Sequence, residues 1–503
     1  MIDLLIVSPS SSNIYQDLKH EYSAIETPIW AGLLANCILS INRSVAIIDL
    51  EAEKISNEDF VKKVEELDPK FVLFVVTGQN PSASTPAMQG AIENAQFLRT
   101  NSAKYKIGFV GPHINALPLE TIQKHDFIDV VFCNEGVFAL KKLVQTNLRD
   151  YELCDINGIG YRDEVGDIKL NPPETVVPQD SLELELPGPS YEMMPDLSSY
   201  RTSYWHCNYS GETSPFASIY TSLGCSFTCN FCMINIINRD KNGSDKYAGM
   251  FNKFRYWSPE FTIKQLDLLN SLGIKNIKIA DELFLNNPKK HAMPLCDLII
   301  DRGYDFNIWA YTRVNTVKEF HLEKLKKAGV NWLAIGIENI KQSVRQEVDK
   351  GKFKDVNISS VVKMIESFDI NVIQNYIVGL PGESIKDAED NINFAIDLNC
   401  AAYNVHPAMA LPGSQLYTDA VINKKRLPEN YSEFGFSSYD CVPLSNGIMT
   451  EEEILEIRDK NWNKYYTNNS VLDMVKTRFG KNAKDNIIKM SQIKVRRKLL
   501  EGV

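Results

Sequence analysis

The sequence lacks several features that would each indicate a particular class of protein. No apolar run reaches the ~18 residues that a membrane-spanning helix needs. The apolar start, Met1–Ser8, has no basic segment before it, so we expect a first β-strand there and not a signal peptide. Ten cysteines in 503 residues are too few for a disulfide scaffold. Without export they are expected to stay reduced, and the protein is expected to be cytoplasmic.

Two further absences concern ligands. The first strand is not followed by Gly-x-Gly-x-x-Gly, which argues against a nicotinamide dinucleotide site. The formal net charge is −10, so the chain has no excess of positive charge with which to bind nucleic acid non-specifically. We therefore expect neither a nucleic-acid partner nor a membrane span.

The composition that is present, with 44% hydrophobic and 23% charged residues, is that of a globular α/β protein of two or three domains. Residues 1–145 alternate apolar runs with helical patterns, which predicts a doubly wound parallel sheet. Ligands of such a sheet bind at the carboxyl ends of its strands. The predicted strands are Leu4–Val7, Val45–Leu50, Phe71–Val76, Ile107–Val110 and Val130–Cys133.

The rest of the chain divides into three parts. Residues 146–215 are rich in proline and predict a linker with one hairpin at Gly158–Leu170. Residues 216–417 resume the strand–helix alternation six times, which fits a partial (β/α)6 barrel. Residues 418–503 predict a helical cap over the barrel mouth. The predicted barrel strands are Ser218–Ser222, Asn276–Ala280, Phe306–Thr312, Trp332–Ile337, Asn371–Val378 and Ala402–His406.

Three cysteines lie directly after the first barrel strand. Cys225, Cys229 and Cys232 are spaced x3 then x2, so their thiolates can converge on one metal centre. Three ligands would leave one iron of a cubane [4Fe–4S] cluster open to bind and activate a substrate. The alternatives are buried free cysteines or a structural zinc site, which would want a fourth nearby ligand. The next candidates downstream, His291 and Cys296, are distant in sequence.

This motif, with the aromatic Phe231 before the last cysteine, resembles the signature of the radical S-adenosylmethionine (SAM) superfamily. The resemblance implies a cluster held by the three cysteines, with SAM chelating the open iron and Phe231 near its adenine. It also implies that the reduced cluster cleaves SAM to a 5′-deoxyadenosyl radical. Later strand ends carry further candidates for SAM binding: Asp281, Glu282, Arg313, Glu338, Gly379 and Gly382.

These candidates match what the resemblance implies. Carboxylates at Asp281 and Glu282 can pair with SAM's ammonium, although an exposed acidic loop is the alternative. Arg313 can form a fork with SAM's carboxylate or close a local ion pair. Glu338 lies in a segment similar to the family's Gly-Ile-Glu-Ser, and residues 379–383 match its Gly-Leu-Pro-Gly-Glu run.

The loops of the first domain resemble those of the cobalamin-binding, Rossmann-like domain that precedes many radical SAM barrels. Small residues there let a bulky cofactor approach the backbone, although turn chemistry alone also explains them. The Asp-x-His-x-x-Gly motif is absent after the first strand, so we expect no histidine below the cobalt. The candidate cobalamin residues are Ser8, Thr77, Gly78, Gln79, Asn80, Ser82, Gly111, His113, Glu135 and Gly136.

Together these resemblances imply a cobalamin-dependent radical SAM methyltransferase. The deoxyadenosyl radical would remove hydrogen from an unactivated carbon of a small-molecule substrate, which then takes the methyl group of methylcobalamin. A flavodoxin or ferredoxin is the expected electron donor. One alternative is a related enzyme that cyclises, contracts a ring or forms a carbon–carbon bond without methylation. Another is a non-catalytic iron–sulfur or zinc binding module. The sequence does not identify the substrate or the catalytic acid and base.

Overall fold

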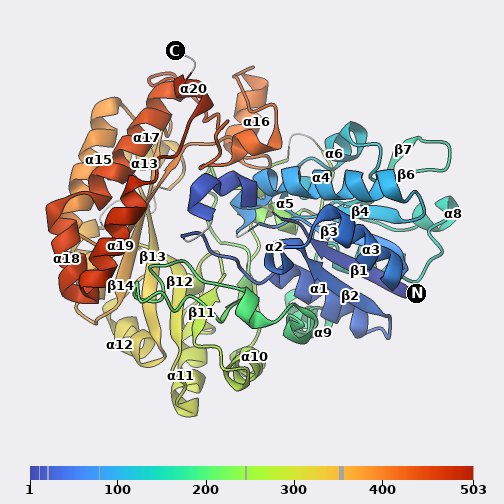
Figure 1. Ribbon diagram of the computed structural model, residues 1–503, viewed down its shortest axis with the longest axis horizontal. Helices are drawn as coiled ribbons and strands as arrows, with labels where there is room; N and C mark the ends of the chain where they lie inside the picture. Colours follow the sequence, from blue (N-terminus) through green and yellow to red (C-terminus); the bar gives the residue numbers. More distant parts are fainter. Residues whose placement is uncertain (11, 20–21, 79, 244–245, 351–355, 502–503) are drawn as a thin grey trace.

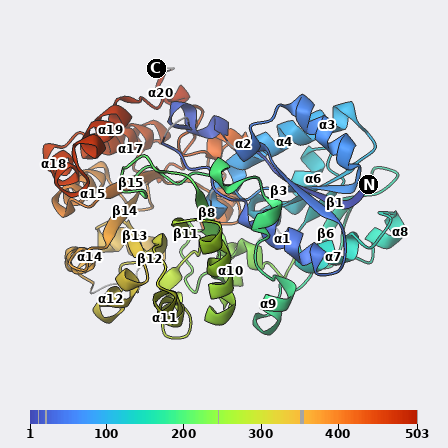
Figure 2. The same cartoon turned by 60° about the horizontal axis from the view of Figure 1, so that its bottom comes forward.

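Two β-sheets with flanking helices organise the chain, which confirms the predicted α/β fold class (Figure 1). The computed structural model describes residues 1–10, 12–19, 22–78, 80–243, 246–350 and 356–501. The first sheet and the C-terminal helices lie at opposite ends of the molecule in both views (Figure 2). The second sheet lies between them.

The first sheet has seven strands in the order β2-β1-β3-β4-β5-β6-β7, and the first five are parallel. The strands are β1 Ile2–Ser8, β2 Val45–Asp49, β3 Pro69–Val75, β4 Lys106–Val110, β5 Val130–Phe132, β6 Ile159–Arg162 and β7 Ile168–Leu170. The helices are α1 Ile29–Leu39, α2 Leu50–Glu53, α3 Asn57–Leu67, α4 Ser84–Asn101, α5 Pro112–Ala116, α6 Pro118–Lys124, α7 Val137–Leu143 and α8 Asp150–Leu153.

Alternating side chains of each strand give this sheet two apolar faces. Leu4 and Ile6 of β1 pack in the core that contains α1 and α7. Leu5 and Val7 pack in the other core, with residues of α3 and α4. Because successive side chains of a strand point to opposite sides, an unbroken apolar run predicts a strand that is covered on both faces. This is why the parallel strands could be recognised in the sequence.

The hairpin predicted within the linker forms, and it extends the first sheet. β6 pairs antiparallel with β5, and β7 pairs antiparallel with β6. The sheet therefore continues beyond residue 145, the expected boundary of the first domain. The rest of the linker crosses to the barrel as short helices, including α9 Leu182–Glu185. The Leu186 carbonyl, directly after α9, accepts a hydrogen bond of 2.8 Å from the Trp257 indole.

The second sheet has six parallel strands in the order β15-β14-β13-β12-β11-β8, an open half-barrel. The strands are β8 Phe216–Ile219, β11 Asn276–Ile279, β12 Asn307–Arg313, β13 Val330–Glu338, β14 Asn371–Val378 and β15 Ala402–Pro407. A short antiparallel pair, β9 Ser222–Leu223 and β10 Arg255–Tyr256, flanks the cysteine motif. Helices α10, α11, α12 and α14 follow one another along the outside of the strands (Figure 2).

The barrel helices begin where the sequence provides N-terminal caps. Ser258 precedes α10 and accepts a hydrogen bond from Phe261 N at 3.1 Å, and Ser384 forms a capping box with Asp387 at the start of α15. The helices of this region are α10 Pro259–Ser271, α11 Ala292–Arg302, α12 Glu319–Lys327, α13 Gln342–Glu347, α14 Ile358–Glu366, α15 Ile385–Leu398 and α16 Gln415–Ile422.

The C-terminal helices pack against the edge of the barrel at β15, whereas the sequence predicted a cap over the barrel mouth. They are α17 Glu451–Tyr466, α18 Asn469–Phe479, α19 Lys481–Gln492 and α20 Lys498–Glu501. Tyr465 and Tyr466 of α17 donate hydrogen bonds to the carbonyls of Cys400 and Tyr403, at 2.6 and 2.8 Å. Both tyrosines are buried, and they cover the outer side of β14 and β15. Among the described residues, no helix has the length and apolarity to span a bilayer.

Candidate functional site

The carboxyl ends of the two sheets face each other, and buried ion pairs join them. Lys278 Nζ on β11 donates two hydrogen bonds, of 2.8 and 2.7 Å, to Glu26 in the connection between β1 and α1. The Lys278 side chain is 2% exposed and lies 4.9 Å from the centre of the Trp309 ring. On the other side, Glu135 after β5 pairs with Arg255 of β10. Ligands of parallel sheets bind at such strand ends, so the space between the sheets is the candidate site.

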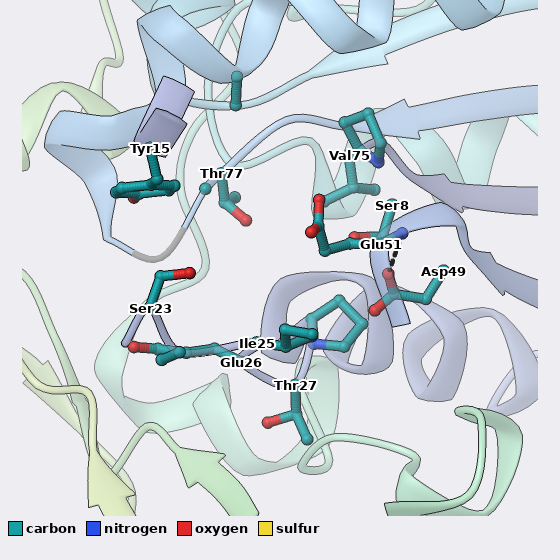
Figure 3. A pocket seen from close by; sticks show the side chains of 15 residues that line it. Ser8, Tyr15, Ser23, Ile25, Glu26, Thr27, Asp49, Glu51, Val75 and Thr77 are labelled. Atoms are coloured by element: carbon teal, nitrogen blue, oxygen red, sulfur yellow. Dashed lines mark hydrogen bonds between the residues drawn. The ribbon is translucent and has the colours of Figure 1, made fainter. Parts of the chain in front are cut away.

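A pocket lies at the ends of β1, β2 and β3 (Figure 3). Its volume is about 620 Å³, part of which is open to solvent. Ser8, Thr77 and Gly78, which the sequence predicts to bind cobalamin, line it, and Glu26 lies on the opposite side. These small residues let a large cofactor approach the backbone, so they fit the predicted group.

The other described residues of the predicted cobalamin set do not line this pocket. A Cβ on Gly111 would lie 2.1 Å from the Val76 carbonyl oxygen, so the close approach of these two loops requires glycine. Asn80 caps a short helix by accepting a hydrogen bond from Ala83 N at 3.2 Å. Ser82 lies in that helix, Gly136 begins α7 with φ +79°, and Gln79 lies outside the described residues. Cobalamin binding by each of these residues stays a prediction.

His113 and His125 of the first domain contact other side chains, away from the pocket. His113 is buried, and its Nδ1 lies 3.0 Å from the Thr85 hydroxyl. Burial lowers the pKa of His113 to about 3, so the ring is neutral. His125 Nε2 lies 2.8 Å from the Tyr431 hydroxyl. Neither histidine lines the pocket.

Cys225, Cys229 and Cys232 lie together in the loop after β9, and all three are partly exposed. Asn235 holds the start of this loop: Cys225 N–H donates to Asn235 Oδ1, and Asn235 Nδ2 donates to the Cys225 carbonyl, both at 2.9 Å. Cys232 N–H donates to the Cys229 carbonyl at 3.0 Å. The motif is therefore a tight turn that is anchored at its first cysteine.

The three thiols of the loop are the donor set that a cubane cluster takes, with one thiolate on each of three irons. Burial raises the pKa of Cys225 to about 11, with a smaller contribution from Cys229, so the thiolate needs the positive charge of iron. The three cysteines fit the predicted cluster.

Asp281, predicted to bind SAM, holds the strand that leads into this loop. Its carboxylate accepts hydrogen bonds from the backbone N–H groups of Thr221 and Ser222, at 2.6 and 3.0 Å. Both hydroxyls also donate to it at 2.6 Å. Asp281 is 0% exposed, so its oxygens are already satisfied and are screened from a ligand. These contacts indicate that Asp281 positions residues 221–222, and SAM binding by Asp281 stays a prediction without a supporting contact.

The neighbouring Glu282 differs from Asp281. It is half-buried and makes no hydrogen bond or ion pair within the described part of the chain. Burial raises the pKa of Glu282 to about 8, which the Lys278 ammonium partly counteracts. An unpaired carboxyl at a strand end, beside the cysteine loop, can take a cationic ligand. Of the two adjacent acidic residues, Glu282 is the one whose carboxyl is not already satisfied, and SAM binding by Glu282 stays a prediction.

Glu282→Gln is therefore expected to weaken SAM binding by about 10-fold or more, because one charge-assisted hydrogen bond is lost. Equilibrium dialysis of SAM against the anaerobic, cluster-loaded protein measures this. Glu260→Gln, an exposed position at the start of α10, is the matched control and should leave the dissociation constant unchanged. Equal SAM affinity in the Glu282→Gln variant and the wild type would exclude this role.

Arg313 contacts the cysteine loop, Phe231 lies within it, and Glu338 is linked to it through Lys350. Arg313 donates to Cys229 Sγ at 3.4 Å, so it is placed beside the predicted cluster. Glu338 ends β13 with φ +61° and forms a buried ion pair with Lys350. The Lys350 ammonium lies 5.7 Å from the centre of the Phe231 ring. A role for these side chains in SAM binding stays a prediction.

The glycine-rich run after β14 is braced by its own glutamate. Glu383 is 0% exposed and accepts hydrogen bonds from Gly379 N and Asn339 Nδ2, both at 2.6 Å. Gly379 has φ +95°, and a Cβ there would lie 2.7 Å from Ile454. Gly382 has φ +76°. The backbone of this loop is therefore fixed beside the barrel mouth, as a backbone contact with SAM would require.

Several residues that build the site could not be recognised in the sequence. Glu26 and Lys278 are 252 positions apart, and nothing in the local pattern pairs them. Asn235 follows the cysteine motif closely and could have been singled out as a residue that holds its loop. Arg255 has no local signal, because its buried partner belongs to the other domain.

Comparisons with known proteins identify both halves of the site. A family model described as the radical SAM superfamily matches residues 219–395, and a model described as a B12 binding domain matches residues 16–144. The chain is 28% identical to an uncharacterized methyltransferase of Pyrococcus horikoshii, over 93% of both chains. It is 22% identical to cytidylyl-2-hydroxyethylphosphonate methyltransferase of Streptomyces wedmorensis, over 91% of this chain and 88% of that protein.

A solved structure has the same architecture. The radical SAM methyltransferase TsrM from Kitasatospora setae, with cobalamin and a [4Fe–4S] cluster bound, superposes with a TM-score of 0.66. The two chains are 15% identical, and the superposition covers 98% of this chain and 99% of that one. This likeness shows a shared fold over the whole length, including the first sheet, the half-barrel and the C-terminal helices. The two matched domains place the chain among the cobalamin-dependent radical SAM enzymes, whose cofactors are a [4Fe–4S] cluster, SAM and cobalamin.

Proposed function

We propose that this protein is a methyltransferase that methylates an unactivated carbon of a small-molecule substrate. The observation that supports the proposal is the arrangement of the two sheets, whose carboxyl ends face each other. The cysteine loop follows β8 and β9 at the start of the barrel. The pocket lies at the ends of β1, β2 and β3, and its lining includes Glu26, which pairs with Lys278 of the barrel. Two buried ion pairs, Glu26–Lys278 and Glu135–Arg255, hold the sheets in this arrangement. The similar proteins of Pyrococcus horikoshii and Streptomyces wedmorensis are both named methyltransferases, which supports the same reaction here.

When bound, the cluster with SAM supplies a radical that removes hydrogen, and cobalamin supplies the methyl group. The chain's own residues bind and orient these groups. Cys225, Cys229 and Cys232 would hold the cluster, and Glu282 would pair with SAM's ammonium. A substrate bound between the two sheets would have its reacting carbon held away from bulk water.

The inner face of the half-barrel is suited to a polar substrate. Asn375 on β14 and Asn404 on β15 are register partners, and Asn404 Nδ2 donates to Asn375 Oδ1 at 3.0 Å. His406 follows on the same face of β15, and Tyr311 lies on β12; all four side chains are partly exposed. Burial lowers the pKa of His406 to about 4, so the ring is a neutral hydrogen-bonding group. We therefore place the substrate against this face.

The reaction requires electrons from outside the chain. A flavodoxin or ferredoxin is the donor that we propose, because the cluster must be reduced by one electron at a time. The cytoplasm is the compartment that we propose. All ten cysteines are free, and a reducing compartment keeps both these thiols and the cluster intact.

The proposal can be tested without knowing the substrate. The full-length protein would be reconstituted anaerobically with iron, sulfide and hydroxocobalamin, reduced with dithionite and supplied with SAM. 5′-Deoxyadenosine reports radical formation, and S-adenosylhomocysteine reports transfer of SAM's methyl group. The matched control is the same protein without cobalamin.

A methyltransferase should form both products, and S-adenosylhomocysteine only when cobalamin is present. Deoxyadenosine without S-adenosylhomocysteine would contradict methyl transfer and support a related enzyme that does not methylate. Intact SAM in every preparation would contradict both and support a non-catalytic metal-binding module.

A further inference from the structure

Two buried arginines connect the segment after the cysteine motif to the first domain. This flanking segment is defined as residues 233–243 and 246–256. Arg239 is 5% exposed and Arg255 is 4% exposed. Each reaches a different loop of the first sheet, and both of these loops contain residues predicted to bind cobalamin. The segment that follows the cluster ligands is therefore attached to two predicted cobalamin loops.

Arg255 makes the stronger attachment. Its guanidinium donates to Glu135 Oε2 at 2.8 Å and to Glu135 Oε1 at 3.2 Å, a two-point ion pair. It also donates to the Val177 carbonyl at 2.8 Å. Glu135 is 1% exposed, and Val177 N–H donates to it at 2.5 Å. Separating this pair would leave two buried charges without partners, which is strongly unfavourable.

Arg239 attaches the second loop. It donates to the backbone carbonyls of Asn115 and Ala116, at 2.6 and 3.0 Å. These carbonyls end helix α5, which begins directly after Gly111. A shift of the loop that contains Gly111 and His113 would therefore break the contacts of Arg239.

The same arginines are linked to the cysteine loop by short contacts. Arg255 on β10 is the register partner of Leu223, two residues before Cys225. Arg255 also donates to Asn238 Oδ1 at 2.9 Å, and Asn238 Nδ2 donates to the Lys253 carbonyl at 3.2 Å. These contacts form one continuous network from Glu135 to the start of the cluster loop.

The backbone around Gly224 leaves little freedom within this network. Gly224 has φ +82°, and a Cβ there would lie 2.1 Å from the Lys253 carbonyl oxygen and 2.9 Å from Asn238 Nδ2. Cys225 is then held by Asn235. Because the packing is this close, a displacement of the flanking segment must move the first cysteine, and the reverse also holds.

We propose that the flanking segment couples the two cofactor sites, so that the cluster in its loop increases the affinity of the first domain for cobalamin. Arg255, Glu135 and Arg239 are positioning residues in this coupling. The inference rests on the proposed function, because it requires both cofactors to bind. By thermodynamic reciprocity, bound cobalamin must favour the cluster-bearing conformation of the loop by the same factor.

The test is a titration of hydroxocobalamin into the full-length protein, with the cluster present and with the cluster removed by a chelator. In the wild type, the dissociation constant should be at least about fivefold lower when the cluster is present. The informative variant is Glu135→Gln with Arg255→Met, because it removes both charges and leaves neither buried alone. In this double variant the ratio of the two constants should fall to about one. Arg302→Met, which removes an exposed ion pair with Asp267, is the matched control and should keep the wild-type ratio.

A second measurement does not depend on cobalamin affinity. By the same reciprocity, a chelator should remove iron from the wild-type cluster more slowly when saturating cobalamin is present, and at the same rate with and without cobalamin in the double variant. A wild-type protein that binds cobalamin equally with and without the cluster would overturn the coupling but leave the proposed function intact. A wild-type protein that binds no cobalamin in either state would overturn both. A double variant that keeps the wild-type ratio would show that these residues do not carry the coupling.

Discussion

Replacement of Cys225, Cys229 or Cys232 with alanine is expected to lower 5′-deoxyadenosine formation by at least about 10³-fold, among the largest effects of any substitution. Each cysteine would hold one iron of the cluster, and their loop provides no substitute: Cys296 and His291 are fully buried elsewhere. A cluster with two protein ligands would be lost or would bind SAM incorrectly. Iron and sulfide content, together with the yield of deoxyadenosine from SAM, measures the effect.

The matched control is Cys154→Ala. Cys154 is exposed and free and lies at the end of α8, away from the barrel. Its removal should leave iron content and SAM cleavage at the wild-type level. Full iron content in all three single variants of the motif would show that the cluster, or another metal centre, is bound elsewhere.

Asp281→Ala is expected to lower the free energy of unfolding by about 3–5 kcal/mol and to reduce the iron content of the reconstituted protein. Four donors, from the backbone and hydroxyls of Thr221 and Ser222, lose their acceptor in a fully buried place. Residues 221–222 lead directly into the cysteine loop, so loss of the carboxylate should disturb the loop as well. Denaturant unfolding of the cluster-free protein and iron analysis of the reconstituted protein measure the two effects.

Two variants separate this role from a general loss of stability. Asp281→Asn keeps one acceptor oxygen and should recover part of both properties. Asp305→Ala removes an exposed carboxylate near the start of β12 and should change the unfolding free energy by less than about 1 kcal/mol. If Asp281→Ala kept its stability but lost SAM affinity, Asp281 would be a SAM ligand, as the sequence resemblance implies, and not a positioning residue.

The strands and helices could be predicted because their signals are local. Apolar runs such as Leu4–Val7 must be covered on both faces, which indicates a parallel sheet with helices on each side. The cysteine motif is equally local, because three thiols within eight residues lie close together in any compact loop. The serine caps before α10 and α15 also stand directly in the sequence.

The side-chain roles could not be predicted in the same way, because they depend on partners that are distant in sequence. Glu135 occupies a position that the family resemblance assigns to cobalamin, yet its carboxylate is paired with Arg255, 120 residues later. His113 contacts Thr85 of α4 and the ring of Tyr431, because α5, which contains His113, packs against α4. Asp281 and Glu282 are adjacent and have the same charge, and only the structure shows that Asp281 is already satisfied.

The position of the C-terminal helices also required the structure. Their apolar stripes show that α17 packs against something, but they do not specify whether that is the mouth or the edge of the barrel. An open half-barrel exposes its last strand, and the unpaired edge and outer face of β15 need to be covered. Tyr465 and Tyr466 cover this face and donate hydrogen bonds to the carbonyls of Cys400, just before β15, and Tyr403, within β15.

In the proposed arrangement, the cluster and cobalamin occupy one space between the two sheets. EPR spectroscopy tests it directly, because the reduced [4Fe–4S] cluster and cob(II)alamin are both paramagnetic. The loaded, full-length protein would be measured with each cofactor alone and with both. We predict that the spectrum of the doubly loaded protein shows spin–spin coupling between the two centres. A spectrum equal to the sum of the two single spectra would place the cofactors far apart and would contradict the arrangement described.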